Sequence, residues 1–200
     1  MNDVRQIRRA RAADHDTLVA LWERSVRATH DFLTEADIGA LRPLVREALS
    51  DNALELWVLT DTADVPIGFM GLAGHDIAAL FLEPARRGQG GGRRLVAHAQ
   101  QLRDGDLTVD VNEQNPAARG FYEALGFRVV NRSPLDDGGR PFPVLHMRRP
   151  TTADPSDAPC RLSRRIDPTQ PRSALWRHGR HRLDRLSPSS RSDGRRAGTP

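Results

Sequence analysis

The sequence predicts an α/β fold in which one mixed β-sheet carries helices on both faces. Short apolar and β-branched runs alternate with segments whose apolar residues recur at helical spacing, and this alternation favours a sheet layered with helices. Two pairs of neighbouring runs, one early and one at the end of the pattern, indicate antiparallel hairpins, so we expect the sheet to be mixed. The chain of 200 residues suffices for one well-packed domain, and no internal repeat is visible in it.

The first elements are a short strand at residues 4–9 and two helices. Apolar residues at helical spacing between residues 18 and 26 place a stripe on one face of the first helix. Thr34 and Asp37 have the spacing of a capping box, which opens the second helix. We expect Pro43 to kink or divide that helix.

The pattern then changes to short strands. Residues 54–60 and 67–73 are apolar runs joined by a turn-rich segment, which predicts a hairpin. Residues 77–82 are a third apolar run, long enough for a buried strand. The glycine-rich stretch at residues 88–92 then opens another helix.

The second half of the pattern repeats the alternation. Residues 107–111 predict a further strand. Pro116 occupies the first turn of a helix that continues to Leu125, and Gly126 provides its C-terminal stop. The last strands follow at residues 127–130 and 144–147.

From residue 150 the periodic pattern ends. Residues 151–200 contain eleven Arg against five Asp, a net charge of about +6, which leaves residues 1–150 at about −2 because the whole chain carries +4. This Pro-, Ser- and Arg-rich segment has too few apolar residues to offset an ordering cost of about 1–2 kcal/mol per residue. We therefore predict a domain at residues 1–149 and a disordered tail at residues 150–200. Since the excess positive charge belongs to the tail, we do not expect the domain to bind nucleic acid.

Composition excludes several other classes of protein. The single Cys160 lies in the tail, so no intrachain disulfide or cysteine-based metal site can form, and we expect no metal. The N-terminus lacks the apolar segment of a signal peptide, and no apolar run approaches the roughly 18 residues that span a bilayer. We expect a cytoplasmic protein, monomeric or homodimeric, without a membrane partner. All 30 basic residues are arginines, which we interpret as the codon usage of a GC-rich bacterial genome.

The glycine-rich turn is the most informative segment. Backbone N–H groups in such a turn can converge on an anion, and the N-terminus of the following helix adds positive potential. A P-loop is excluded because it requires lysine, and the dinucleotide pattern G-x-G-x-x-G fails because Arg93 stands at its last position. The turn therefore predicts a different phosphate site, with charged contacts from Arg87 and Arg93. Its residues are Arg87, Gly88, Gln89, Gly90, Gly91, Gly92 and Arg93.

Two motifs carry a family resemblance. Residues 87–92 match R/Q-x-x-G-x-G/A, and residues 115–127 match N-x-x-A-x-x-x-Y-x-x-x-G-F. With these motifs in this order, the chain resembles the GNAT family of N-acetyltransferases over residues 4–148. Residues 24–33, 111–115 and 136–143 resemble in particular the bacterial YjaB-like group of that family.

The resemblance implies a GNAT fold and a site for acetyl-CoA in a V-shaped opening between the strands at residues 77–82 and 107–111. Backbone groups of Leu80, Phe81 and Leu82 would pair with the pantetheine arm. The amides of the glycine-rich turn would hold the pyrophosphate. Asn115 would help to hold the cofactor arm, and Tyr122 would face the sulfur.

Acetyl transfer from a thioester to an amine requires an uncharged amine, a stabilised oxyanion and a proton for the thiolate. A strand N–H near Leu80 can supply the oxyanion contact, and the hydroxyl of Tyr122, unless it only packs in the core, can supply the proton. Direct attack in a ternary complex needs no covalent enzyme intermediate. The general base is left open, because a chain of waters is at least as suited to the role as any side chain, and among the side chains His30 is slightly favoured. The candidates are His30, Asp31, His75, Asp76 and Glu113.

We therefore expect an enzyme that acetylates a primary amine on a small molecule, a peptide or a protein. Two alternatives are a toxin-type acetyltransferase that modifies charged tRNA and a non-catalytic module that binds acetyl-CoA. Asp136 and Asp137 indicate either a cationic acceptor or ordinary turn chemistry. His15, His98 and His146 are given no part in the site.

Overall fold

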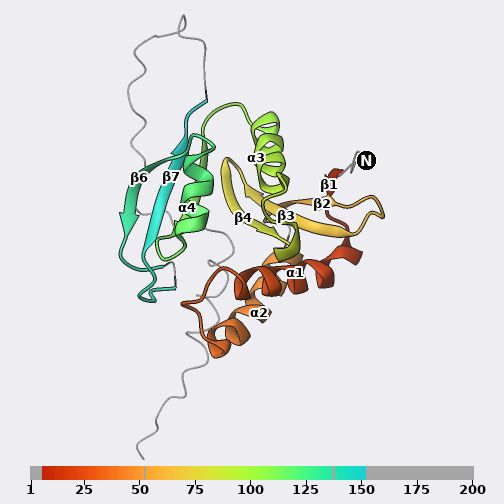
Figure 1. Cartoon of the computed structure of the whole chain (residues 1–200), viewed down its shortest axis with the longest axis horizontal. Helices are drawn as coiled ribbons and strands as arrows, with labels where there is room; N and C mark the ends of the chain where they lie inside the picture. Colours follow the sequence, from red (N-terminus) through yellow and green to blue (C-terminus); the bar gives the residue numbers. More distant parts are fainter. Residues whose placement is uncertain (1–5, 52, 137, 152–200) are drawn as a thin grey trace, which may run out of the picture.

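The computed structural model describes residues 6–51, 53–136 and 138–151 (Figure 1). The tail predicted at residues 150–200 therefore lies, apart from its first two residues, outside the described residues. Within the described part, no helix combines the length and the apolar character needed to cross a membrane.

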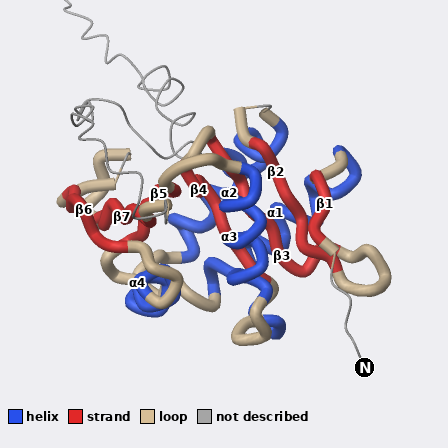
Figure 2. Tube along the Cα trace, turned by 90° about the horizontal axis from the view of Figure 1, so that it is seen from above, coloured by secondary structure: helices blue, strands red, loops and turns tan. Residues whose placement is uncertain are grey.

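A seven-stranded mixed sheet runs through the molecule, with strand order β1-β2-β3-β4-β5-β7-β6 (Figure 2). All neighbours pair antiparallel except β4 and β5, which are parallel. The expected early and late hairpins are both confirmed as β2–β3 and β6–β7. The strands are β1 (Ile7–Arg9), β2 (Glu55–Thr60), β3 (Pro66–Ala73), β4 (Asp76–Leu82), β5 (Leu107–Asn112), β6 (Arg128–Ser133) and β7 (Val144–Arg149).

Helices cover both faces of the sheet, as predicted. One buried cluster joins α1 (His15–Arg27) and α2 (Glu35–Ser50) to one face of β2, β3 and β4. A second cluster joins α3 (Gly91–Leu102) and α4 (Pro116–Glu123) to the opposite face, where it continues across β5 and β7. Two short 3-10 turns, Ala12–Asp14 and Pro84–Arg86, complete the elements.

The helix α2 begins at the predicted capping box. Thr34 Oγ1 accepts a hydrogen bond from the Asp37 amide at 3.2 Å, and Asp37 Oδ2 accepts one from the Thr34 amide at 2.9 Å. Of the two outcomes expected for Pro43, a kink or a division, the division does not occur, because α2 is continuous from Glu35 to Ser50. Because Pro43 has no N–H, the Gly39 carbonyl lacks its usual helical donor. Both residues lie on the exposed face of α2, where water can hydrogen-bond to that carbonyl.

The parallel pair β4–β5 separates after two residue pairs. Asp76 lies opposite Thr108 and Ile77 opposite Val109, and no later pair forms between these strands in the described chain. On the other side of β4, Ile77 and Ala79 oppose consecutive residues of β3, so Ala78 is the extra residue of a β-bulge. Because a bulge bends its strand, β4 turns away from β5 and leaves a V-shaped opening in the sheet.

Candidate active site

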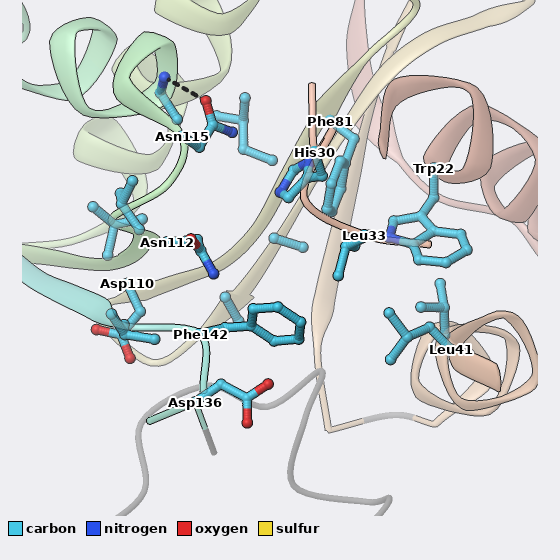
Figure 3. Close-up of a pocket in the computed structure, with 18 of the residues that line it drawn as sticks. Trp22, His30, Leu33, Leu41, Phe81, Asp110, Asn112, Asn115, Asp136 and Phe142 are labelled. Atoms are coloured by element: carbon cyan, nitrogen blue, oxygen red, sulfur yellow. Dashed lines mark hydrogen bonds between the residues drawn. The ribbon is translucent and has the colours of Figure 1, made fainter. Parts of the chain in front are cut away.

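Two cavities that share six lining residues lie along β4, and the first of them occupies the opening between β4 and β5. The central cavity lies between the loop after α1 and the strand β5, and Figure 3 shows Asp110 and Asn112 on one side of it and Trp22, Leu33 and Leu41 on the other. The turn cavity extends from there to the glycine-rich turn before α3. Both cavities are lined by His30, Leu80, Phe81, Asn115, Ala118 and Tyr122.

The glycine-rich turn has a backbone conformation that side chains disfavour. Gly88 has φ of +73°, and Gly90, which caps α3, has φ of +81°. The first α-helical hydrogen bond that follows is donated by the Arg94 amide to the Gly90 carbonyl, so the amides of the first turn are not used inside the helix. These amides and the helix dipole make the turn cavity suited to a phosphate group.

Gly91 and Gly92, whose amides belong to the first turn of α3, also have a packing role. A Cβ at Gly91 would lie 2.9 Å from Leu59 Cδ2, and a Cβ at Gly92 would lie 2.9 Å from Phe121 Cζ. Both glycines are buried. Their lack of a side chain lets α3 approach β2 and α4 closely, which fixes the position of the helix N-terminus.

The structure brings all the predicted cofactor-binding residues to one cavity except Gln89. Leu80, Phe81, Leu82, Arg87, Gly88, Gly90, Gly91, Gly92, Arg93, Asn115 and Tyr122 all line the turn cavity. Gln89 does not line it, and its side-chain amide donates to the Ala85 carbonyl at 3.1 Å. The side chain of Gln89 therefore contributes to the shape of the turn and does not line the cavity with the others.

Asn115 lies at the junction of the two cavities and is buried. Its Oδ1 accepts from the Ala118 amide at 3.0 Å, which caps the N-terminus of α4. The capping bond leaves the side-chain NH₂ as the donor that can face a ligand.

Tyr122 also lines both cavities and is only 6 % exposed. Its ring packs against those of Phe121 and Phe127, with centroid distances of 5.0 and 5.2 Å. Burial, and to a smaller extent the Asp76 carboxylate, raises the pKa of Tyr122 well above its usual value. The hydroxyl therefore keeps its proton through the physiological range and can act as a hydrogen-bond donor.

His30 lies beside Phe81 at the junction, on the loop after α1 (Figure 3). Burial, assisted by the charge of Arg87, lowers the pKa of His30 from 6.5 to about 4. Thr29 Oγ1 donates to the Ser25 carbonyl at 2.8 Å and lies 2.7 Å from His30 Nδ1. Because the single hydroxyl proton of Thr29 is used by the carbonyl, Nδ1 carries the imidazole proton and Nε2 carries the lone pair.

The other predicted bases lie outside both cavities. Asp31 is exposed, and His75 lies exposed in the turn between β3 and β4. Asp76 accepts from Thr108 Oγ1 at 2.9 Å, at the end of β4 where the strands are still paired. Glu113 is held by Arg132 in a bidentate ion pair with contacts of 2.7–3.1 Å.

Of the two neighbouring aspartates in the loop after β6, Asp136 can be described, and its contacts are those of an ordinary turn. Asp136 lines the central cavity, but its carboxylate accepts from the amides of Gly138 and Arg140, each at 2.9 Å, and pairs with the Arg140 guanidinium at 2.7 Å. Asp137 lies outside the described residues.

Sequence reasoning missed Asp110, which lines the central cavity from β5. Leu107, Val109 and Val111 face the core with α3 and α4, so the alternate residues Thr108, Asp110 and Asn112 face the other side of the sheet. That alternation was the available signal. The same alternation on β7 directs His146 to this face, where its Nδ1 lies 2.7 Å from Asp110 Oδ1.

Comparisons with known proteins agree with this architecture. The Acetyltransferase (GNAT) domain family matches residues 52–129. This span contains β4, β5 and both sequence motifs, at residues 87–92 and 115–127. The peptidyl-lysine N-acetyltransferase YjaB of Salmonella typhimurium is 48% identical over 144 residues, which cover 72% of this chain and 97% of that protein. Its counterpart in Escherichia coli (strain K12) is also 48% identical, over 70% of this chain and 94% of that protein.

Solved structures show the same fold. The solution structure of apo-form YjaB from Escherichia coli has a TM-score of 0.68 and 47% sequence identity, and the match covers 72% of this chain and 97% of that one. A PaiA N-acetyltransferase from Thermoplasma acidophilum, solved in complex with coenzyme A, has a TM-score of 0.60 at 19% identity, covering 73% and 98% of the two chains. At that identity the likeness concerns the fold alone.

Proposed function

The chain belongs to the GNAT family of N-acetyltransferases, and from this premise we propose that it transfers the acetyl group of acetyl-CoA to the side-chain amine of a lysine in a peptide or protein. The observation that carries the proposal is that the central cavity and the turn cavity lie side by side and share lining residues. A cavity at the glycine-capped N-terminus of α3, suited to the diphosphate, shares six lining residues with a cavity that Asp110 also lines.

The lysine acceptor is supported by two features. The relatives that are 48% identical over almost their whole length are named for acetylating peptidyl-lysine. The central cavity is largely lined by apolar side chains and has the carboxylate of Asp110 on its wall, an arrangement that fits the aliphatic stem and ammonium group of lysine. For this reason we prefer a peptide to charged tRNA as the acceptor, and expect the slightly acidic domain not to bind nucleic acid.

The glycine-rich turn would hold the diphosphate of acetyl-CoA through the amides of the first turn of α3. Arg87 and Arg93 line the same cavity and would add charge-assisted contacts to phosphate oxygens. The pantetheine arm would follow the open edge of β4 along Leu80, Phe81 and Leu82, with the Asn115 NH₂ group as a further donor. These contacts would bring the thioester to the junction of the two cavities.

Direct attack of the amine on the thioester would then be favoured chiefly by holding the two reactants together. A backbone N–H of β4 near Leu80 would stabilise the oxyanion. Because its pKa is raised, Tyr122 would donate a hydrogen bond to the sulfur as negative charge develops there, and the proton that the amine loses after attack would complete the thiol. His30, neutral at physiological pH, would present the Nε2 lone pair to the junction as an acceptor.

The proposal is tested by acetylation of matched peptides by the full chain. One peptide carries an internal lysine and a blocked N-terminus, and the other has arginine in place of that lysine and a free N-terminus. We expect release of coenzyme A and a mass increase of one acetyl group only on the lysine peptide. Acetylation of the free N-terminus alone, or no transfer to either peptide while acetyl-CoA binds, would contradict the lysine assignment.

A further inference from the structure

One wall of the central cavity lies opposite the carboxylate that would face the acceptor amine. Figure 3 shows Trp22, Leu33 and Leu41 on this wall, across from Asp110 and Asn112. We call this wall the apolar recess, and it consists of Trp22, Leu33, Leu41, Leu44 and Val45. All five residues line the central cavity, and none of them lines the turn cavity. The recess is therefore open to a group that enters the central cavity beyond the cofactor arm.

The sheet beneath the recess carries small side chains. Ala78 and Ala79 line the central cavity from β4, and both pack with the buried cluster under α1 and α2. Two consecutive residues contact the same cluster because Ala78 is the extra residue of the β-bulge. With only a methyl group at each position, space remains between β4 and the leucine and valine side chains of α2.

The residues of β4 pass from one cavity to the other in their order along the strand. Leu82 lines only the turn cavity, Leu80 and Phe81 line both cavities, and residues 77–79 line only the central one. A pantetheine arm that follows β4 from Leu82 to Leu80 would therefore direct its acyl group toward the two alanines. The opening closes at residue 77, where β4 is paired with β5, so an acyl chain that extends past Leu80 would enter the recess.

We propose that the apolar recess binds the hydrocarbon chain of acyl groups longer than acetyl, so that the enzyme also transfers propionyl and butyryl groups from their coenzyme A thioesters. The inference rests on the proposed transfer to lysine and widens the range of its donors. The central cavity has a volume of about 190 Å³, against roughly 150 Å³ for an apolar cavity that holds benzene. It therefore has room for more than the two carbons of an acetyl group.

An acyl chain suits the recess better than a neighbouring side chain of the acceptor peptide. Trp22, Leu41 and Val45 are only 3%, 2% and 4% exposed. A neighbouring side chain starts from a peptide backbone that has to stay at the protein surface, whereas the acyl chain starts from the thioester at the junction of the two cavities. The acyl chain therefore reaches these buried residues from inside the protein.

The bonds that form and break are the same for each acyl group. The neutral lysine nitrogen forms a bond to the carbonyl carbon, and the bond from that carbon to sulfur breaks. One nitrogen-bound proton completes the thiol of coenzyme A, and the proton that the ammonium group loses before attack passes to solvent. Because the added carbons stay unchanged, the recess acts only on the binding and orientation of the donor.

The recess should distinguish hydrocarbon acyl groups from charged ones. None of its five side chains can be ionised, and burial of a carboxylate without a partner costs more than burial of a methylene gains. Succinyl-CoA has a four-carbon acyl group, as butyryl-CoA does, but its chain ends in a carboxylate. We therefore expect succinyl-CoA to be a poor donor.

The test measures the binding of acetyl-, propionyl-, butyryl- and succinyl-CoA to the full chain by calorimetry, and kcat/KM for transfer of each acyl group to the lysine peptide. We expect the dissociation constant to fall by about threefold to fourfold for each methylene added up to butyryl, which is the ratio that burial of a CH₂ group gives. Succinyl-CoA should bind about tenfold or more weakly than butyryl-CoA. Propionyl and butyryl should both appear on the lysine.

Two substitutions of Leu44 change the size of the recess in opposite directions. Leu44 is only half-buried, so both variants should fold. Leu44→Phe should lower the ratio of butyryl to acetyl kcat/KM by about tenfold, because the larger ring fills the recess. Leu44→Ala should shift the preferred acyl group to a longer one. The matched control is the same pair of substitutions at Leu102, a half-buried leucine of α3 that lines neither cavity, where the ratio should not change.

Dissociation constants that do not depend on acyl length would overturn the recess. An acyl-length dependence that both Leu44 variants leave unchanged would also overturn it, because the chain would then lie elsewhere. If the Leu44 variants change which residues are accepted beside the lysine and leave donor choice unaltered, the recess belongs to the acceptor and the proposal is wrong. By contrast, binding that depends on acyl length and on Leu44, without transfer to any lysine peptide, would support the recess and refute the proposed lysine acetylation.

Discussion

Gly92 on α3 lies directly against Phe121 on α4, so close that a Cβ on the glycine would come within 2.9 Å of Phe121 Cζ. The contact joins the helix whose N-terminus faces the turn cavity to the helix that carries Tyr122. The spacing between the proposed diphosphate site and the proposed position of the sulfur is therefore set in part by the absence of one methyl group at Gly92.

Substitution of Gly92 by alanine should push the two helices apart. We expect the free energy of unfolding to fall by about 1–3 kcal/mol and acetyl-CoA affinity to weaken, because an overpacked contact shifts the backbone at the N-terminus of α3. Chemical denaturation and calorimetry measure the two effects. Gly120→Ala is the control, since a Cβ there meets no atom within 4 Å and alanine favours the helix. Equal free energies of unfolding for both variants would show that the Gly92–Phe121 contact does not set the spacing of the two helices.

Replacement of Tyr122 by phenylalanine separates catalysis from binding. The ring packs between Phe121 and Phe127, so the fold and acetyl-CoA affinity should be retained. Loss of the hydroxyl should lower kcat by about 100-fold, because the sulfur loses its hydrogen-bond donor. Coenzyme A release under saturating substrates measures this change. An unaltered kcat would remove Tyr122 from the chemistry.

The lowered pKa of His30 predicts a pH-dependent stability. Since its pKa is about 4 in the folded chain and 6.5 ordinarily, the unfolded state binds a proton on His30 between these values and the folded state does not. The free energy of unfolding should therefore fall as pH drops from about 6.5 to about 4, by at most about 3 kcal/mol.

The comparison for this effect is His30→Gln. That variant should lose less stability than the wild type over the same pH range in urea denaturation, while His75→Gln, at an exposed histidine, should follow the wild type. Parallel curves for wild type and His30→Gln would contradict the account of the buried imidazole.

Pro43 gives a prediction about α2 that is independent of the site. The helix is continuous through this residue, so an alanine there restores an amide donor to the Gly39 carbonyl. We expect Pro43→Ala to raise the free energy of unfolding by about 1–2 kcal/mol, the helix gain being offset partly by a more flexible unfolded chain. A loss of stability on denaturation would indicate that Pro43 fits a local bend.

The sequence predicted most of the fold because its elements are strongly periodic. The stripe from Leu18 to Val26 and the Thr34–Asp37 capping box are local signals, and both helices follow them. Whether Pro43 kinks or divides α2 was left open by the sequence, because the cost of a proline depends in part on whether the Gly39 carbonyl can reach water. That condition depends on which face the core covers.

The site likewise has one part that the sequence predicts and one part that only the tertiary structure reveals. The glycine-rich turn and Asn115 lie in contiguous motifs, so their grouping was visible in the sequence. His146 was given no role because only the strand order β5-β7-β6 brings it to Asp110, 36 residues away along the chain. Strand order is a property of tertiary packing, and no local pattern encodes it.

Calorimetric titration of the full chain with acetyl-CoA tests the central claim most directly. We predict saturable binding of one molecule per chain, weakened by salt and reduced about tenfold or more when Arg87 and Arg93 are both replaced by glutamine. The absence of saturable heat, or an affinity unaffected by that double substitution, would contradict a diphosphate site at the N-terminus of α3.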